Sequence, residues 1–369
     1  MYGRPMQTSS ASIRVAWVDI AKGICIVMVV MVHATLGVEV AAGEQGWMHY
    51  LVAWARPFRM PDFFLISGLF LGLVIDRPWL RYLDRKVVHF AYFYVLWLTI
   101  QFAFKAPGMA VEEGVGGAAA NYLLAFVQPF GTLWFVYLLP IFFVFTRLVR
   151  GVPTWFVLVW AAVLEMLPVA TGSVVFDEFC ARYVYFFAGY ALAANVFRIA
   201  DWIRANPGTA LGLMAPWTLL NAFFVFTPAP AALVPFLQPD IGHSGAQGGI
   251  AELPFVSLVL GTAGLVAVIA VATLLDGRRG TEWLRWLGTH SIVIYLAFFL
   301  PMAITRVVLL RTGIVQDIGS ISLIVTVVAV AGPAVLYGLV KWSGWGNFLF
   351  ERPAWAHVDM PAKAREAAV

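Results

Sequence analysis

The residues that could do chemistry begin in the first apolar run, where ionisable side chains interrupt aliphatic sequence. Asp19, Lys22 and His33 share this run. Lys22 and His33 are 11 residues apart, close to three helical turns, so we expect both on one helix face, about 16 Å apart along the axis. Asp19 precedes Lys22 by the spacing of an ion pair. An imidazole exchanges protons near neutral pH, so His33 is a candidate general base.

Both features also have simpler explanations. An ionisable side chain inside a bilayer costs at least about 2.5–3.5 kcal/mol, so its presence suggests a role. Asp19 and Lys22 could nevertheless form a snorkelling pair at the water boundary. His33 could instead provide a hydrogen bond between helices of a bundle. The first run alone leaves these interpretations open.

A second group of charges surrounds two prolines in the next apolar run. Arg56, Arg59 and Asp62 lie beside Pro57 and Pro61. Proline breaks a helix, and a broken membrane helix is tolerated only beside protein or a watery cavity. We expect this break in the outer half of the membrane, together with the imidazole of the first run. Either arginine could stabilise an oxyanion or orient an acceptor there. The alternative is an interfacial helix start in which Asp62 pairs with Arg59.

Basic residues also gather in the first loop that we expect inside. Arg77, Arg81 and Arg85 recur every four residues, so they share one face if the segment is helical. Lys86 and His89 follow directly. Guanidinium and ammonium groups bind phosphate, which favours a phosphate-binding patch. Topology determinants or contacts with lipid headgroups are the alternative.

The composition indicates that a membrane positions these groups. Of the 369 residues, 62% are hydrophobic and 12% are charged, against about 45–50% and about 25% in a soluble domain. We therefore predict an all-α, polytopic membrane helix bundle with about ten transmembrane helices. The apolar runs that carry this prediction are residues 15–39, 58–75, 87–105, 128–148, 153–171, 181–198, 207–227, 254–275, 288–310 and 320–342.

The distribution of basic residues predicts the topology. Lys and Arg are concentrated in alternate loops, as in cytoplasmic loops of membrane proteins, and an even number of spans places both termini in the cytoplasm. We divide the chain into a cytoplasmic segment over 1–14, a transmembrane domain over 15–342 and a cytoplasmic tail over 343–369. The Pro- and Gly-rich loop over 228–253 could cap an external entrance. The tail beyond Glu351 is expected to be loosely ordered.

Charge and cysteine content disfavour other classes of protein. The net charge is +4, but no basic domain is visible, so nucleic acid is not an expected partner. Two cysteines without metal-ligand spacing give no reason to expect a metal. Membrane lipids are the expected surroundings, and the oligomeric state is left open.

The first two clusters resemble the acyltransferase 3 family of membrane acyltransferases. That family opens its first span with an Asp, a nearby Arg or Lys, an apolar stretch and a His, here Asp19, Lys22 and His33. Asp-Ile-Ala-Lys-Gly, as found here, is similar to a subgroup of sugar O-acetylases. Met60-Pro61-x-Phe63-Phe64-x-x-Ser67-Gly68 is similar to the second signature of the family, with Arg59 where a His is common.

Later segments carry weaker similarities. Trp134 and Phe135 after Gly131 resemble the Trp-Phe-Leu motif of the family, with Val136 in place of Leu. A late His that is common in the family is absent. The remaining similarities are Tyr185-Phe186-Phe187-x-Gly189-Tyr190 and Gly288-x-x-Ser291-x-x-x-Tyr295.

The resemblance implies a multi-pass enzyme of the bacterial inner (plasma) membrane that uses cytoplasmic acyl-CoA, with acetyl-CoA or succinyl-CoA as the expected donor. A glycan or a lipid-linked sugar is the expected acceptor. We expect His33 as the base, with Asp19, Lys22 and Arg59 as the other catalytic candidates. The candidates for binding CoA are Lys22, Arg81, Arg85 and Lys86. The candidates for binding the acceptor are Arg56, Arg59, Ser67, Trp134 and Phe135.

Other functions compete with this interpretation. A transporter or flippase of acyl groups or glycolipid also uses broken helices and intramembrane charges, although no matching pair of broken helices is visible in the two halves. A membrane acyltransferase of the other large fold family would use an Asn and a late His. His290 lies at the start of the ninth run, close to the surface, which disfavours that assignment. An acyl-His intermediate is open alongside direct transfer.

Overall fold

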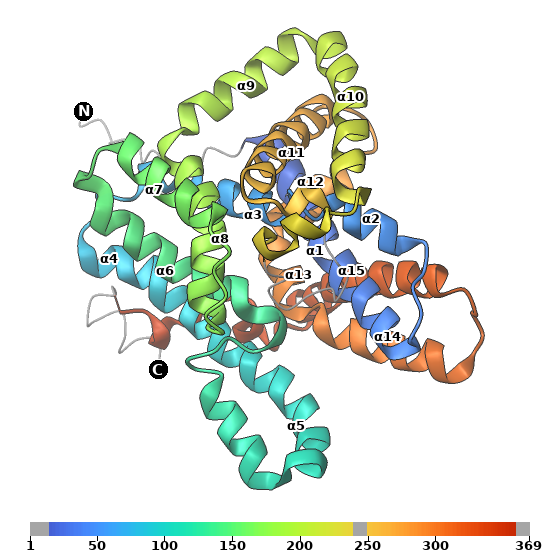
Figure 1. Cartoon of the computed structure of the whole chain (residues 1–369). Helices are drawn as coiled ribbons and strands as arrows, with labels where there is room; N and C mark the ends of the chain where they lie inside the picture. Colours follow the sequence, from blue (N-terminus) through green and yellow to red (C-terminus); the bar gives the residue numbers. More distant parts are fainter. Residues whose placement is uncertain (1–14, 239–248, 359–369) are drawn as a thin grey trace, which may run out of the picture.

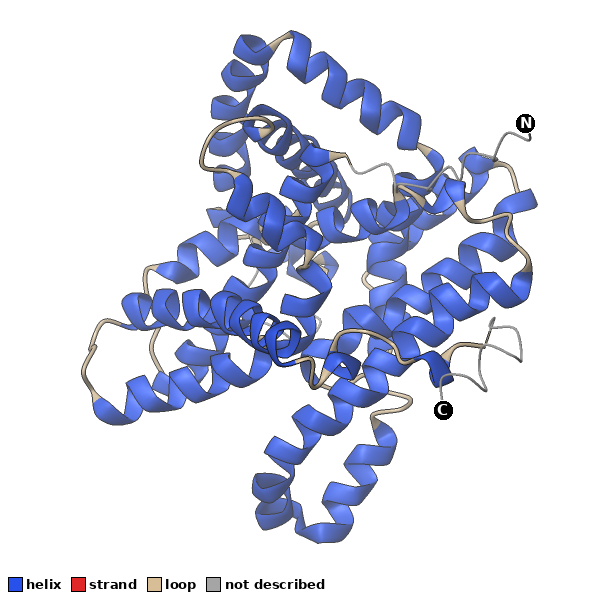
Figure 2. Ribbon diagram, turned by 180° about the vertical axis from the view of Figure 1, so that it is seen from behind, coloured by secondary structure: helices blue, strands red, loops and turns tan. Residues whose placement is uncertain are grey.

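The computed structural model describes residues 15–238 and 249–358. The predicted segment over 1–14, the middle of the 228–253 loop and the end of the tail therefore lie outside the described residues. Every named element in the described part is a helix (Figures 1 and 2). The predicted all-α class is confirmed.

The described chain consists of α-helices and short 3₁₀ or π turns, joined by loops. The α-helices are α1 (Ala16–Ala42), α2 (Met48–Ala55), α3 (Arg59–Gly68), α4 (Trp79–Leu83), α5 (His89–Leu124), α6 (Trp134–Leu148), α7 (Thr154–Met166), α8 (Val174–Ala191), α9 (Ala193–Ala205), α10 (Pro207–Phe226), α11 (Pro254–Leu275), α12 (Glu282–Thr289), α13 (Ser291–Ala297), α14 (Phe299–Thr312) and α15 (Ile318–Ser343). The short turns are η1 (Leu71–Leu73), η2 (Asp84–Val88), η3 (Gly131–Leu133), η4 (Val149–Gly151), η5 (Ala231–Phe236), η6 (Ile250–Glu252), η7 (Asn347–Leu349) and η8 (Ala354–Ala356).

Several helices have the length and composition of membrane spans. In the described part of the chain, 6 helices qualify, and the number rises to 8 if each of two bent pairs is one span. The protein is therefore a multi-pass membrane protein, while ten spans and cytoplasmic termini stay predictions. The bent pairs are α8 with α9, at 76°, and α13 with α14, at 50°.

The predicted runs differ from the observed helices where the backbone breaks. Runs 181–198 and 288–310 each cross a bend, and run 58–75 contains α3, which ends at Gly68. Run 153–171 holds α7, which stops before Leu167. Leu167 precedes a proline, which disfavours helical backbone there. An apolar run reports hydrophobicity and not continuous helix. A helix can therefore break within such a run, because neighbouring protein can satisfy the exposed backbone groups inside a membrane.

Helix α1 is the centre of the bundle and packs against α12, α15, α11 and α3 (Figure 1). Its contact with α12 is close because two glycines meet there. A Cβ added at Gly288 would lie 1.6 Å from the Asp19 carbonyl oxygen, and one at Gly23 would lie 2.1 Å from the Leu284 oxygen. Small residues let helix backbones approach in membranes. The first and last sequence motifs therefore meet as a packing contact.

Helix α3 packs on α8 in the same way. A Cβ at Gly68 would lie 2.1 Å from the Phe186 oxygen, and one at Gly189 would lie 2.0 Å from the Leu65 oxygen. The second signature and the Tyr-Phe-Phe-x-Gly-Tyr segment are thus packed together. Because α3 also contacts α1, these crossings fix the two helices that carry the candidate catalytic residues.

The end of the described chain returns to the bundle after α15. We call residues 344–358 the C-terminal strap. Tyr92 Oη donates to the Phe348 oxygen at 2.9 Å, and Trp97 Nε1 donates to the Leu349 oxygen at 3.0 Å. Arg352 is buried. The predicted loose order beyond Glu351 is therefore wrong up to Val358, because Asp84 accepts hydrogen bonds from the Arg352 side chain and the Val358 N–H.

Candidate active site

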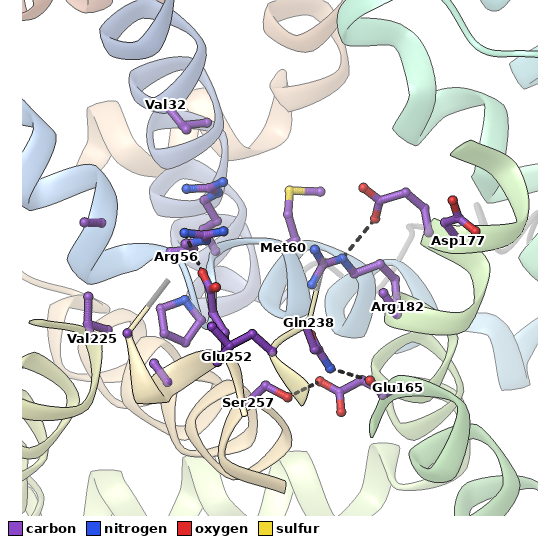
Figure 3. A pocket seen from close by; sticks show the side chains of 18 of the residues that line it. Val32, Arg56, Met60, Glu165, Asp177, Arg182, Val225, Gln238, Glu252 and Ser257 are labelled. Atoms are coloured by element: carbon purple, nitrogen blue, oxygen red, sulfur yellow. Dashed lines mark hydrogen bonds and ion pairs between the residues drawn. The ribbon is translucent and has the colours of Figure 1, made fainter. Parts of the chain in front are cut away.

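A cavity of about 530 Å³ gathers one set of the predicted residues. Its lining includes Gln45, Asp177 and Pro228, from three loops predicted to be outside, so we call it the outer cavity. The described parts of the 228–253 loop form one of its walls. Figure 3 shows part of the lining. The predicted site residues that line it are His33, Arg56, Arg59, Trp134 and Phe135.

Helix α1 places His33 at the edge of the outer cavity. The side chain is half-buried, and its ring centroid lies 5.6 Å from that of Phe298. Val29 and Val32 line the cavity from the same helix, so this helix face is aliphatic around the imidazole. His33 is thus both packed against the bundle and accessible to a molecule in the cavity.

The break between α2 and α3 brings two arginines to the same cavity. Helix α2 ends at Ala55 and α3 begins at Arg59, as the prolines predict. Arg56 Nη1 lies 2.5 Å from Glu252 Oε1, and Arg59 Nη1 donates to the Val52 oxygen at 3.5 Å. Arg56 is therefore tied to the loop that follows α10.

Trp134 and Phe135 are positioned by a tyrosine from a different motif. Tyr295 Oη donates to the Thr132 carbonyl and accepts from the Phe135 N–H at 3.2 Å. Tyr295 itself is buried and lines the outer cavity. The Trp-Phe motif is thus held beside the cavity by the last motif of the chain, a role that the sequence pattern did not reveal.

A buried carboxylate on the opposite wall was missed by sequence analysis. Glu165 Oε1 accepts from Tyr185 Oη at 3.1 Å and from Ser257 Oγ at 3.1 Å. Gln238 donates to the Glu165 backbone oxygen (Figure 3). The sequence did offer a signal, because Glu165 interrupts the apolar run over 153–171. A glutamate inside such a run indicates a polar neighbour.

An ion pair on α8 completes the polar lining. Arg182 Nε donates to Glu178 Oε2 at 3.1 Å, and both residues line the outer cavity. Their spacing of four residues suits an ion pair on a helix, and this spacing could have identified them. The outer cavity therefore contains carboxylates and guanidinium groups that neutralise one another in pairs.

The basic loop lines a second cavity of about 450 Å³. Its residues come from segments predicted to be inside, so we call it the inner cavity. The predicted CoA ligands Arg81, Arg85 and Lys86 all line it. Helix α4 begins at Trp79, after Arg77, so the predicted stripe is not one continuous helix. Its complete described lining is Val74, Arg77, Arg81, Tyr82, Arg85, Lys86, His89, Arg352 and His357.

Three predicted site residues lie outside both described linings. Lys22 Nζ is 3.9 Å from Asp19 Oδ1, which gives the predicted ion pair, but neither residue is in the described lining of these two cavities. Ser67 Oγ donates to the Phe63 oxygen at 2.7 Å, the helix's own carbonyl four residues earlier. The structure therefore does not bring Lys22 together with Arg81, nor Ser67 together with the outer cavity.

A series of phenylalanines, which we call the aromatic row, lies between the two cavities. Successive ring centroids are 4.9, 5.1, 5.3 and 5.2 Å apart. Its first ring lines the outer cavity, and Lys86 Nζ of the inner cavity is 4.3 Å from the centroid of its last ring. The two cavities share no described lining residue. In order, the aromatic row is Phe135, Phe64, Phe142, Phe186 and Phe143.

Comparison with known proteins agrees with this arrangement. Residues 15–338 match a family model described as an acyltransferase domain. The chain is 29% identical over 177 aligned residues to inner membrane protein YcfT of Escherichia coli (strain K12), covering 40% of this chain and 48% of that protein. The alignment thus spans about half of the relative's length. No solved structure matches the chain. Because the family match runs from the start of α1 into α15, the chain belongs to the acyltransferase 3 family of membrane acyltransferases.

Proposed function

We propose that this protein transfers an acyl group, acetyl or succinyl, from cytoplasmic acyl-CoA to a hydroxyl of an extracytoplasmic glycan or related acceptor. The observation that carries the proposal is the position of His33 on the wall of the outer cavity, which Arg56 and Arg59 also line. A base and a guanidinium beside one cavity are the groups that acyl transfer to a hydroxyl requires.

The chemistry at His33 balances without another reactant. The neutral imidazole takes the proton of the acceptor hydroxyl as its oxygen attacks the thioester carbonyl. A new C–O bond forms, and the tetrahedral oxyanion is stabilised by Arg59. The C–S bond then breaks, and the CoA sulfur leaves and takes the proton from His33. In the alternative order, His33 attacks first and an acyl-His intermediate carries the group to the acceptor.

The donor is assigned to the inner cavity. CoA is polyanionic, and Arg81, Arg85 and Lys86 offer guanidinium and ammonium donors to its phosphates. Its thin pantetheine arm must then pass the aromatic row to bring the thioester to His33. The ion pair of Lys22 with Asp19 lies on the same helix as His33, and we assign it to guiding that arm. We assign the reaction to the inner (plasma) membrane, because a relative of this chain is named an inner membrane protein.

Arg56 and the remaining polar groups are assigned to the acceptor. The ion pair of Arg56 with Glu252 joins the helix break to the 228–253 loop. Trp134 and Phe135 line the cavity but are largely buried, and we assign them to shaping the wall against which a sugar ring would pack. Acceptor entry from the outer side therefore uses residues distinct from those of the donor side.

A transporter or flippase is the second candidate because two observations favour it. The cavities are separate, and two helix pairs are bent at 76° and 50°, as in proteins that open to alternate sides. Such a protein would move an acyl group or glycolipid without forming an ester. Transfer from radiolabelled acetyl-CoA or succinyl-CoA by purified protein therefore separates the two candidates.

The direct test is ester formation on surface polysaccharide. Deleting the protein should remove acetyl or succinyl esters from the host's glycans, and the wild type should restore them. His33→Ala should fail to restore them. His49→Gln is a matched control, because His49 lines the same cavity but lies 2.9 Å from Glu39 Oε2. Undiminished esters with His33→Ala would show that His33 is not the base.

A further inference from the structure

The inner cavity has an excess of positive charge that the family resemblance does not fully explain. Among the described residues, no carboxylate lines it. Like charges in a partly enclosed space raise the free energy of that space until an anion enters. The permanent cations of the lining are Arg77, Arg81, Arg85, Lys86 and Arg352.

One of these cations comes from beyond the family match. Arg352 lies in the C-terminal strap, whereas the family model ends at residue 338. Its side chain is 3% exposed. Nη1 donates to the Asp84 carbonyl at 2.8 Å and Nη2 donates to Asp84 Oδ2 at 2.6 Å. Its Nε is buried without a hydrogen-bond partner in the described residues. One N–H donor of the fixed guanidinium therefore has no acceptor among them.

His357 is fixed by the same guanidinium. Its Nδ1 lies 2.7 Å from Arg352 Nη2. A guanidinium has donors and no acceptor, so Nδ1 accepts and the ring proton lies on Nε2. Because the side chain lines the inner cavity and is 31% exposed, this N–H is a donor that a bound anion can use.

Asp84 joins the strap to the basic loop. It begins η2, the π turn that also contains Arg85 and Lys86. Asp84 Oδ1 accepts from the Val358 N–H at 2.7 Å, while Oδ2 accepts from Arg352. Both carboxylate oxygens are therefore used in positioning the strap. π turns are rare and frequent at functional sites, and here one holds two chain segments against a single cavity.

We propose that the C-terminal strap completes the donor site, with Arg352 and His357 binding phosphate groups in the inner cavity together with the basic loop. This inference rests on the proposed function, which assigns acyl-CoA to that cavity. The ligand chemistry is a cluster of phosphates. CoA supplies such a cluster from the cytosol, and an anionic lipid headgroup is the other source of the same chemistry.

The experiment measures binding of CoA itself to the purified full chain in phosphatidylcholine nanodiscs. Arg352→Gln should weaken CoA binding about tenfold, because a hydrogen bond to a charged group is lost. His357→Ala should weaken it several-fold. Arg150→Gln should leave the affinity unchanged. This control also removes an arginine next to the basic loop, but Arg150 pairs with Asp76 and lies outside the cavity lining.

A second variant separates binding from folding. Arg352→Gln strands the buried Asp84 carboxylate, which is destabilising by itself. The double variant Asp84→Asn with Arg352→Gln removes both charges and should recover much of the thermal stability. Its CoA affinity should stay about tenfold below that of the wild type if the cation contacts the ligand. Recovery of affinity along with stability would overturn the proposal, since Arg352 would then act only in folding.

The remaining outcomes distinguish this inference from the proposed function. If Arg81→Gln weakens CoA binding while Arg352→Gln and His357→Ala do not, the strap is not part of the site but the donor assignment stands. If the wild type does not bind CoA at all, the proposed function fails too. Phosphatidylglycerol nanodiscs provide the last arm. In these nanodiscs, the lipid could raise the thermal stability of the wild type but not of the Arg352→Gln and His357→Ala variants. If added CoA does not remove that stabilisation, the cavity binds a lipid headgroup, and the donor role of the strap is overturned.

Discussion

The two cavities differ in how their charges are balanced. In the outer cavity, Arg56 pairs with Glu252 and Arg182 pairs with Glu178. In the inner cavity, Arg352 also pairs with Asp84, but Arg77, Arg81, Arg85 and Lys86 line it as well, and no carboxylate is among its described lining. A neutralised cavity suits uncharged polyols, whereas an unbalanced one suits a polyanion. The difference therefore supports the proposed placement of donor and acceptor on opposite sides.

The largest expected effect tests whether the cavities work independently. His33→Ala should lower acyl transfer at least about 100-fold, because a positioned base contributes that much or more. CoA affinity should remain at the wild-type value, because His33 lines only the outer cavity. Transfer assays with labelled acyl-CoA and CoA titrations check the two quantities. Loss of CoA binding in His33→Ala would contradict the view that the two cavities bind their ligands independently.

The next effect tests the charge of the inner cavity. Replacing Arg81 and Arg85 by glutamate should weaken CoA binding by about 10- to 100-fold, since two charge-assisted contacts become repulsive. Raising the salt concentration should weaken wild-type CoA binding as well. The KM for a neutral acceptor should hardly respond to either change. If the affinity for CoA and the KM for the acceptor change by the same factor, the two cavities do not differ in charge as described.

A smaller effect is expected when the outer cavity loses one of its charge pairs. Glu252→Gln removes the ion pair with Arg56 and should raise the KM for a neutral glycan about threefold, in keeping with a partly exposed pair of modest strength. The donor KM should not change. Steady-state kinetics with either substrate varied measure both values, and Arg150→Gln serves again as the control for a lost surface pair.

The smallest effect concerns a residue that the motif pointed to and the structure does not support. Ser67→Ala should change transfer by less than about twofold, because this hydroxyl bonds its own helix and lies outside the described lining of the outer cavity. Gly68→Ala, one residue later, should instead impair folding, because its Cβ would meet the Phe186 oxygen at 2.1 Å. Measurements of activity and of thermal stability separate the two. A large loss of activity in stable Ser67→Ala would return that residue to the site.

The local features of the site were predictable, whereas its long-range partners were not. Spacing alone placed Asp19 beside Lys22, and the prolines gave the break before Arg59. Pro301 lies four residues after Ala297, the last residue of α13, and could have indicated the bend there. The bend after α8 has no proline or glycine at Leu192, so no residue signalled it. Such breaks depend on tertiary neighbours that supply the missing backbone contacts.

The order of the C-terminal strap was also not predictable from local sequence. The polar composition beyond Glu351 suggested loose order, but Asp84, which binds Arg352 there, lies 268 residues away in sequence. Two glycines have a structural role that the motifs did not indicate. Gly23 and Gly288 looked like parts of functional motifs, and the structure shows them where two helix backbones touch. Motifs of this family can therefore record packing as well as chemistry.

The aromatic row has a consequence for the cell's energy supply. A continuous wet passage from the cytosol to the exterior would leak protons and dissipate the membrane potential. Packed phenylalanine rings offer water and ions no hydrogen bonds, so a path between the cavities stays sealed unless something displaces them. In the proposed reaction, the slender pantetheine arm fills the opening that it makes. The proposed transfer would thus move an acyl group across the membrane while the barrier stays closed to ions.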